Sequence, residues 1–416
     1  MTTSPRPARA ALAFVAVSIC LDALAQSTSF PILPRLAQHL LDGDAAAASR
    51  WVGWLEVGWA LPQFLAAPFL GMLSDRLGRR PVIVASLLGV GAELILNALA
   101  PDVWWLLAGR MLCGFTCGAQ AASMAYVADV TPPEGRTRAY AWTGAALWSG
   151  VIAGPAAGGL LTLLDLRAPF WASAAVALAA GVYGLLVLPE SLPADRRTPM
   201  RWLAANPAGA IRFAFGTPSL APLSLALLLS WLAFQGKDNM LVLYTTYRYG
   251  WSALAFGAFI AFVAGGSLMM QTLLSARIAA RTGDRAAVLG GLAFEAAGMA
   301  LMGLAPTGAL FVVANIPTVI GAAARPSLQA MMSRAVTADQ QGRLQGAIGA
   351  IAGFTSFTAP VAFTQAFAWS IAARGAAWSG ITIFAGACLT CVALGLVGLA
   401  RPGPTSDGED TLISNL

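Results

Sequence analysis

Eight charged residues interrupt long apolar stretches of this sequence, and a charge in such a place can do chemistry that a loop charge cannot. They are five acids and three bases: Asp22, Glu56, Glu93, Arg110, Lys237, Asp238, Glu295 and Arg325. A charge inside an apolar helix is costly, so it usually faces a cavity or a partner. These residues cannot all be neutralised as pairs, and burial disfavours the charged form of an unpaired carboxyl. Such a carboxyl can take up and release protons near neutral pH, which is what coupling transport to a proton gradient requires.

The same residues would have a structural role if they formed static ion pairs that fix helix packing. Lys237 is the only lysine of the chain, and it lies beside Asp238 and close to Gln235. Neighbours in sequence point to different sides of a helix, so Lys237 and Asp238 need not pair. Lys237 could bind an anionic group of a substrate or neutralise an acid from another helix, and the sequence leaves both roles open.

The composition indicates that membrane-spanning helices carry these residues. Of 416 residues, 58% are hydrophobic and 11% charged, and the mean hydropathy is +0.70. So few charges could not cover the surface of a soluble protein of this size. A span needs about 20 apolar residues, so twelve spans with short loops would fill most of the chain. The net charge of +6 comes from arginines in short loops, which indicates membrane topology rather than nucleic-acid binding.

The apolar windows divide into two sets of six. We expect spans at 11–33, 51–73, 82–100, 103–127, 139–162 and 170–188, and at 221–246, 252–276, 286–305, 309–332, 344–369 and 376–400. This pattern predicts an N-terminal half at 1–188, a cytoplasmic linker at 189–220, a C-terminal half at 221–400 and a cytoplasmic tail at 401–416. Most arginines fall in segments that would be cytoplasmic if both termini were inside. Two six-helix halves around a central cavity are typical of transporters.

Two further motifs are typical of segments that move when a transporter closes its cavity. The loop GMLSDRLGRRP (71–81) predicts a tight turn with Gly78 at positive φ. We expect Asp75 to accept hydrogen bonds from a helix N-terminus there, and the basic residues to face the cytoplasm: Arg76, Arg79 and Arg80. The string GVIAGPAAGG (150–159) predicts a closely packed helix that Pro155 can kink, with glycines at small-residue spacing: Gly150, Gly154 and Gly158. An ordinary basic loop and ordinary helix packing are the simpler explanations of these two strings.

These strings resemble motifs of the major facilitator superfamily, in its twelve-span drug/proton antiporter branch, and the chain is most similar to the tetracycline/proton antiporters. GMLSDRLGRRP resembles the signature loop between spans two and three. GRMLCGFTCGA (109–119) resembles the span-four motif, whose arginine falls on Arg110. GVIAGPAAGG resembles the span-five motif of antiporters. LDALAQSTSFPILP (21–34), LPES (188–191), RPSLQAMMSR (325–334) and QGRLQG (341–346) are similar to segments of the tetracycline exporters.

The resemblance implies an all-α membrane protein with twelve transmembrane helices, of the major facilitator fold. It implies that Asp22, Glu93 and Glu295, with Arg110, take part in proton coupling, although Glu93 and Glu295 stand where that family has Asp. It also matches Gln235 to a glutamine of span seven. We expect the substrate to contact the intramembrane polar residues: Asp22, Glu56, Gln235, Lys237, Asp238 and Arg325. The gate would involve Asp75, Arg76, Gly78, Arg79, Arg80 and the residues Gly150, Gly154, Pro155 and Gly158.

The sequence also departs from the tetracycline exporters. Their span-eight histidine has no counterpart near residues 263–271, and Glu56, Lys237, Asp238 and Arg325 stand where uncharged residues are expected. A zwitterionic, cationic or metal-chelated substrate would suit the surplus acids. The alternatives are export of a metabolite (a sugar, siderophore or amino-acid derivative) and a proton-independent facilitator or symporter.

An intramembrane enzyme is disfavoured because the only histidine, His39, lies in a loop. A sensor without transport activity would have no need of so many intramembrane charges. We therefore expect a proton-driven exporter of the inner membrane with no metal or other cofactor. Its partners would be a small-molecule substrate, protons and the lipid bilayer, without nucleic acid, and the protein would be a monomer.

Overall fold

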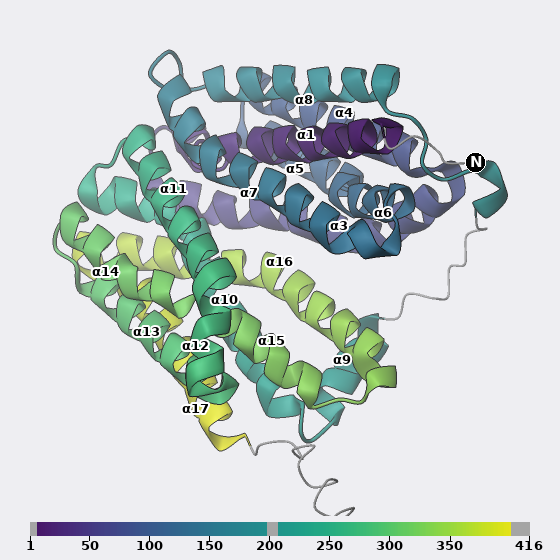
Figure 1. Ribbon diagram of the computed structural model, residues 1–416. Coiled ribbons are helices and arrows are strands. Elements are labelled where there is room, and N and C mark those ends of the chain that lie inside the picture. The colour runs from purple at the N-terminus through teal and green to yellow at the C-terminus, as the bar shows by residue number, and fades with distance from the viewer. Residues whose placement is uncertain (1–5, 198–206, 401–416) are drawn as a thin grey trace, which may run out of the picture. The chain divides into compact units, whose positions relative to one another are not determined.

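The computed structural model describes residues 6–197 and 207–400, and every regular element in these ranges is helical (Figure 1). The first part of the chain contains α1 (Arg6–Ser29), α2 (Leu33–Leu40), α3 (Ala45–Leu77), α4 (Arg79–Leu99), α5 (Val103–Thr116), α6 (Ala119–Val130), α7 (Arg136–Leu161) and α8 (Ala168–Val187). Short 3₁₀ turns at Pro133–Gly135 and Ala194–Arg196 connect some of these helices. The architecture is the all-helical one that the composition predicts.

The second part of the chain is built in the same way. It contains α9 (Pro207–Gly216), α10 (Ala221–Tyr249), α11 (Ala253–Met269), α12 (Ser275–Thr282), α13 (Asp284–Leu304), α14 (Gly308–Gly321), α15 (Ala324–Arg334), α16 (Gln341–Arg374) and α17 (Ile381–Leu399). A π-helical turn, Met270–Leu274, joins α11 to α12, and 3₁₀ turns lie at Ala338–Gln340 and Ala376–Trp378. The expected tail, 401–416, and residues 198–206 of the expected linker lie outside the described ranges.

Within the described residues, ten helical segments are long and apolar enough to cross a membrane. The two other expected spans fall on α10 and on the pair α5 and α6. The helix breaks at Cys117 and Gly118, leaving α5 with 14 residues and α6 with 12. At this break the Gly118 amide donates to the Thr116 carbonyl oxygen at 2.8 Å and to Ser86 Oγ at 3.1 Å. Helix α10 has 29 residues, but Gln235, Lys237 and Asp238 make its centre polar.

Two short helices occupy segments where no helix was expected. Helix α2 follows the first span directly, because Pro34 is tolerated in the first turn of a helix. Helix α9 lies in the linker region. Side-chain caps define other starts: the Asp44 carboxylate accepts from the amides of Ala46 and Ala47 at the start of α3, and Asp102 does the same for α5.

The described residues form two compact units. Unit 1 lies within Met1–Ala205, Asn239–Ala264 and Pro360–Ala376, and unit 2 lies within Asn206–Asp238, Gly265–Ala359 and Ala377–Leu416. The units cut across the expected halves 1–188 and 221–400, which stay a prediction. Residues 239–264 contact unit 1 through hydrogen bonds. Arg35 of α2 donates to Thr246 Oγ1 at 2.8 Å and to the Trp251 carbonyl oxygen at 2.6 Å. These bonds hold the end of α10 against α2 in unit 1.

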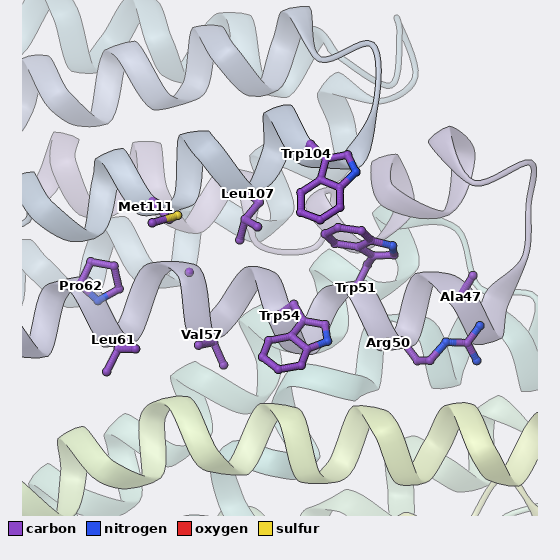
Figure 2. A pocket seen from close by; sticks show the side chains of 11 residues that line it. Ala47, Arg50, Trp51, Trp54, Val57, Leu61, Pro62, Trp104, Leu107 and Met111 are labelled. Atoms are coloured by element: carbon purple, nitrogen blue, oxygen red, sulfur yellow. The ribbon is translucent and has the colours of Figure 1, made fainter.

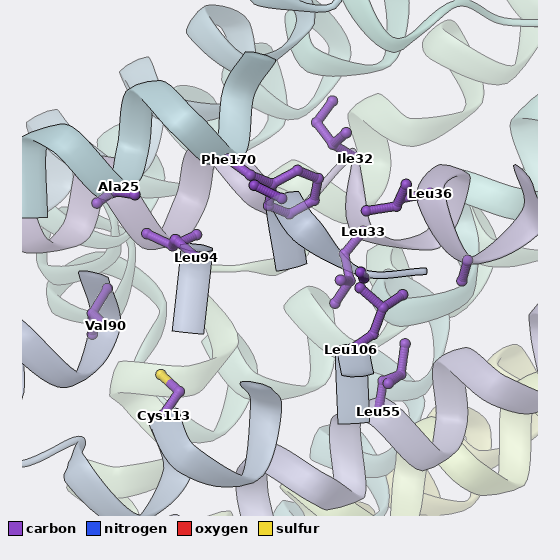
Figure 3. Close-up of a cluster of buried hydrophobic side chains, with 14 of the residues drawn as sticks. Ala25, Ile32, Leu33, Leu36, Leu55, Val90, Leu94, Leu106, Cys113 and Phe170 are labelled. Atoms are coloured by element: carbon purple, nitrogen blue, oxygen red, sulfur yellow. The ribbon is translucent and has the colours of Figure 1, made fainter. Parts of the chain in front are cut away.

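The core of unit 1 lies where α1, α2, α3, α4, α5 and α8 meet. Ile32, Leu36, Leu55, Leu106 and Phe170 are fully buried there (Figure 3). Helix α1 packs along α7 and α8, while α5 packs along α3 and α4. Figure 2 shows α3 and α5 side by side. Unit 2 has its own core around α13, which packs on α14, α15 and α17.

Candidate functional site

Unit 1 brings four of the sequence-predicted charges together. Glu93 of α4 and Arg110 of α5 form an ion pair between Oε1 and Nη2, with side-chain exposures of 1% and 12%. Asn97, one turn after Glu93, donates from Nδ2 to the same carboxylate oxygen at 3.1 Å. Glu56 of α3 interacts electrostatically with both members of the pair, and Asp22 of α1 with Glu93. We call Asp22, Glu56, Glu93 and Arg110 the acidic cluster.

The acidic cluster contains three carboxyl groups and one guanidinium. Neither Asp22 nor Glu56 forms an ion pair with a described residue, whereas Glu93 does. Asp22 Oδ1 and Glu93 Oε2 are buried and have no hydrogen-bond partner among the described residues. Each of these oxygens is therefore able to accept a proton or a donor group of a ligand. A cluster with more acids than bases suits protons or cationic groups.

Unit 2 holds a second group of charges, in which each acid forms an ion pair with a base. Arg325 of α15 lies 3.4 Å from Glu295 of α13, measured from Nη2 to Oε1. Lys237 Nζ lies 2.5 Å from Oδ1 of Asp238, and Lys237 is 2% exposed. Gln235 Nε2 donates to Thr355 Oγ1 at 2.7 Å. The four charged members, Lys237, Asp238, Glu295 and Arg325, are called the balanced cluster because acids and bases are equal in number.

Phe234 links the two bases of the balanced cluster. The Arg325 guanidinium lies 3.7 Å from the centre of the Phe234 ring, and Lys237 Nζ lies 5.5 Å from it. Both distances are short enough for cation–π attraction. Lys237 thus pairs with an acid of its own helix, which neither role considered for it had included, and it also interacts electrostatically with Glu295 of α13, an acid from another helix. Together the clusters account for the three bases, and among the described residues neither Asp22 nor Glu56 forms an ion pair with any of them.

The turn between α3 and α4 has Gly78 at φ 112°, as its glycine predicts. The expectation for Asp75 is wrong, because Glu190 occupies the role assigned to it. The Glu190 carboxylate accepts from the amides of Arg79 and Arg80, at 2.8 and 3.2 Å, and so caps the N-terminus of α4. A Cβ on Gly78 would lie 2.5 Å from Cδ of Glu190, so only glycine leaves room for this cap.

Asp75 pairs instead with the Arg79 side chain. Arg79 Nη1 lies 2.5 Å from Asp75 Oδ1, and its Nε lies 3.1 Å from Asp129 Oδ2. The Arg79 side chain is 12% exposed, so it is held in this network, and the expectation that it faces the cytoplasm stays a prediction. Arg76 is exposed, and the Arg80 guanidinium donates to the Leu185 carbonyl oxygen.

The glycines of α7 face α1, as close helix packing predicts. A Cβ added to Gly150 would lie 2.8 Å from the Leu24 amide nitrogen, and one added to Gly154 would lie 2.8 Å from that of Thr28. Gly158 meets Thr28 in the same way. These distances are shorter than van der Waals contact, so no larger residue fits without separating the backbones. Helix α7 continues through Pro155.

Several residues of these sites were not found by sequence reasoning. Asn97 and Thr355 are uncharged, and Phe234 is one apolar residue among many, so nothing in their types marked them. Glu190 had a signal, because the LPES string that contains it was already part of the resemblance. Asp129 lies at the end of α6 and is marked only by its position after an apolar run.

Comparisons with known proteins agree with this fold. Residues 15–360 match the Major Facilitator Superfamily. The chain is 35% identical to the class C tetracycline resistance protein of Escherichia coli over 384 residues, which are 92% of this chain and 95% of that protein. It is 31% identical to the class G tetracycline resistance protein of Vibrio anguillarum, over 93% of this chain and 96% of that one. The crystal structure of the nucleoside transporter NupG (D323A mutant) is similar with a TM-score of 0.77 at 13% identity, covering 94% of this chain and 100% of that one.

Proposed function

Because the chain belongs to the Major Facilitator Superfamily of membrane transporters, we propose that it is a proton-coupled antiporter that exports tetracycline or a related drug. The observation that carries the drug assignment is the 35% identity to a tetracycline resistance protein over nearly the whole of both chains. Proton coupling is supported by the acidic cluster, in which neither Asp22 nor Glu56 forms an ion pair with a described residue. The proton gradient is the only driving force in this proposal, without a cofactor.

In this mechanism, protons load Asp22, Glu93 or Glu295. Protonation lowers the cost of rearranging buried carboxyls and shifts the population between two access states. The substrate contacts Asp22, Glu56, Gln235, Lys237, Asp238 and Arg325 and leaves in exchange for protons. The Asp75–Arg79 pair latches the gate, together with Arg76, Gly78 and Arg80. The packed helix that carries Gly150, Gly154, Pro155 and Gly158 allows closure.

The test is tetracycline uptake into inverted vesicles with and without an inward-acid proton gradient. We expect uptake that needs the gradient and is lost in Glu295→Gln, because that variant removes the titrating carboxyl but keeps its shape. Asp284→Asn is the matched control. It removes a carboxylate at the start of the same helix, where Asp284 pairs with the exposed Arg334. Absence of uptake by folded, inserted protein would exclude tetracycline, and uptake without a gradient would exclude proton coupling.

A metabolite exporter is a second candidate, favoured by the balanced cluster. Lys237 and Asp238 add an ion pair, buried on the lysine side, where the tetracycline exporters are expected to have uncharged residues. The same vesicles identify such a substrate through the protons it releases when added outside. A metabolite that releases protons in wild type but not in Glu295→Gln, while tetracycline releases none, would establish this candidate.

The topology proposed here places a monomer in the inner membrane with both termini in the cytoplasm. The arginine distribution supports this orientation. Reporter fusions at the two termini, one active only in the cytoplasm and one only outside it, measure it directly. Activity of the external reporter at either end would contradict the proposal.

A further inference from the structure

A groove on unit 1 has no member of the acidic cluster among its described lining residues. It has a volume of about 590 Å³ and is lined by α3 and α5 (Figure 2). On α3 the lining positions include Trp54, Val57, Gly58 and Leu61, a spacing that selects one face of the helix. Neither Glu56 nor any other acid of the described ranges lines the groove. The groove is therefore an apolar site distinct from the acidic cluster.

One end of the groove is aromatic and basic, and the other is wholly apolar. Figure 2 shows Arg50, Trp51 and Trp104 at one end, Trp54 near the middle, and Pro62 with neighbouring apolar side chains at the other end. Trp51 and Trp104 meet edge to face, with ring centres 4.7 Å apart. Tryptophan is typical of the headgroup level of a membrane, where one side of the ring is wet and the other apolar. The groove thus runs from a headgroup level toward the apolar interior of the bilayer.

Among the described residues that line the groove, Arg50 is the one that carries a charge. Its side chain is exposed and forms no ion pair with a described residue, although its backbone carbonyl oxygen accepts from Gln365. Two other arginines of unit 1 donate to backbone instead. Arg167 donates to the carbonyl oxygens of Ala98 and Ala100, and Arg248 donates to that of Ala376. The Arg50 guanidinium is therefore available for an external anion.

The length of the groove suits one acyl chain. From Arg50 to Leu61, α3 rises by about 17 Å at roughly 1.5 Å per residue. The hydrocarbon core of a bilayer is roughly 30 Å thick, and one acyl chain spans half of it. The groove is therefore about as long as one acyl chain. A phosphate near Arg50 would place its chain along Val57 and Leu61.

We propose that the groove between α3 and α5 binds an anionic phospholipid, with one acyl chain along the groove and the phosphate at Arg50. Charge complementarity selects this occupant. A zwitterionic headgroup would bring its own ammonium group close to the Arg50 guanidinium, with no acidic side chain in the groove to receive it. An anionic headgroup such as phosphatidylglycerol adds no positive charge. The site is independent of the proposed transport function.

The test is native mass spectrometry of delipidated full-length protein titrated with palmitoyl-oleoyl phosphatidylglycerol or the matching phosphatidylcholine. We expect one phosphatidylglycerol to bind more tightly than phosphatidylcholine. Arg50→Gln should weaken phosphatidylglycerol binding about fivefold, since an arginine near a membrane surface contributes roughly 1 kcal/mol toward an anionic lipid. Arg281→Gln is the control, because it removes an exposed arginine of α12 in the other unit.

A second variant tests the place of the chain. Val57→Trp fills the groove and should lower the preference for the long-chain lipid over dihexanoyl phosphatidylglycerol by about tenfold, equivalent to roughly two buried methylenes. Val57→Leu is a smaller filling if the tryptophan variant does not fold. Equal binding of both headgroups by unchanged protein would overturn the proposal. So would an undiminished phosphatidylglycerol preference in Arg50→Gln, or an undiminished chain-length preference in folded Val57 variants.

Discussion

Removing either Glu93 or Arg110 alone should destabilise the folded protein more than removing both. Both side chains are largely buried, at 1% and 12% exposure, and the pair shares one carboxylate oxygen with Asn97. Removal of one member leaves a buried charge without its partner, which costs about 3–5 kcal/mol. Replacement of both by neutral residues avoids that cost. The two single variants should therefore be strongly non-additive.

The surrounding residues set the order of these effects. In Glu93→Gln the Arg110 guanidinium keeps an acid nearby, because Glu56 interacts with it electrostatically. That variant should lose about 3 kcal/mol, at the lower end of the range. In Arg110→Gln the three remaining carboxyls face one another without a base, so the loss should be about 5 kcal/mol. The double variant should lose no more than Glu93→Gln, so the two single losses should exceed the double loss by a coupling free energy of about 5 kcal/mol or more.

The measurement is equilibrium unfolding of the four proteins in the same detergent. The double-mutant cycle then gives the coupling free energy without knowledge of the absolute stability. Losses that simply add, with a coupling free energy below about 0.5 kcal/mol, would refute the argument. Glu93→Gln being less stable than Arg110→Gln would contradict the role given to Glu56.

Three further predictions concern helix packing and capping, and unfolding of purified protein measures each of them. Gly154→Leu should destabilise the protein by at least about 1–3 kcal/mol, since its Cβ would already lie 2.8 Å from the Thr28 amide nitrogen; an unchanged midpoint would contradict the packing. Glu190→Ala should cost about 1–2 kcal/mol because two amides of α4 lose their cap, whereas Glu190→Gln should keep part of it. Arg35→Gln should cost about 1–3 kcal/mol through its lost bonds to Thr246 and Trp251, and a loss below about 0.5 kcal/mol would refute that link.

Features that depend on local chemistry were predictable from the sequence. Apolar windows predicted the helices, and the spacing of Gly150, Gly154 and Gly158 predicted a close helix contact, because a missing side chain has the same effect in any surroundings. Positive φ at Gly78 was predictable for the same reason. The break between α5 and α6 was not predictable, because Gly118 lies inside the continuous apolar run 103–127 that predicts a single span.

Partner choice among the charges was not predictable. The sequence indicates that two acids must lack a basic partner, but identifying Asp22 and Glu56 requires knowing which helices adjoin. Lys237 illustrates the difficulty, because helix geometry alone does not require it to pair with its sequence neighbour Asp238. The α4 cap was missed because Glu190 is more than a hundred residues away along the chain, and capping rules are local.

The glycine stripe of α7 also affects how this protein can evolve. Every single-base change in a glycine codon that alters the amino acid and does not end translation adds a side chain, and the α1–α7 contact has no room for one at Gly150, Gly154 or Gly158. Every single amino-acid substitution at these three glycines that one base change can produce should therefore disturb the α1–α7 contact. Variants that arise under selection for a new substrate should accumulate at other positions and leave these three codons unchanged except for synonymous substitutions.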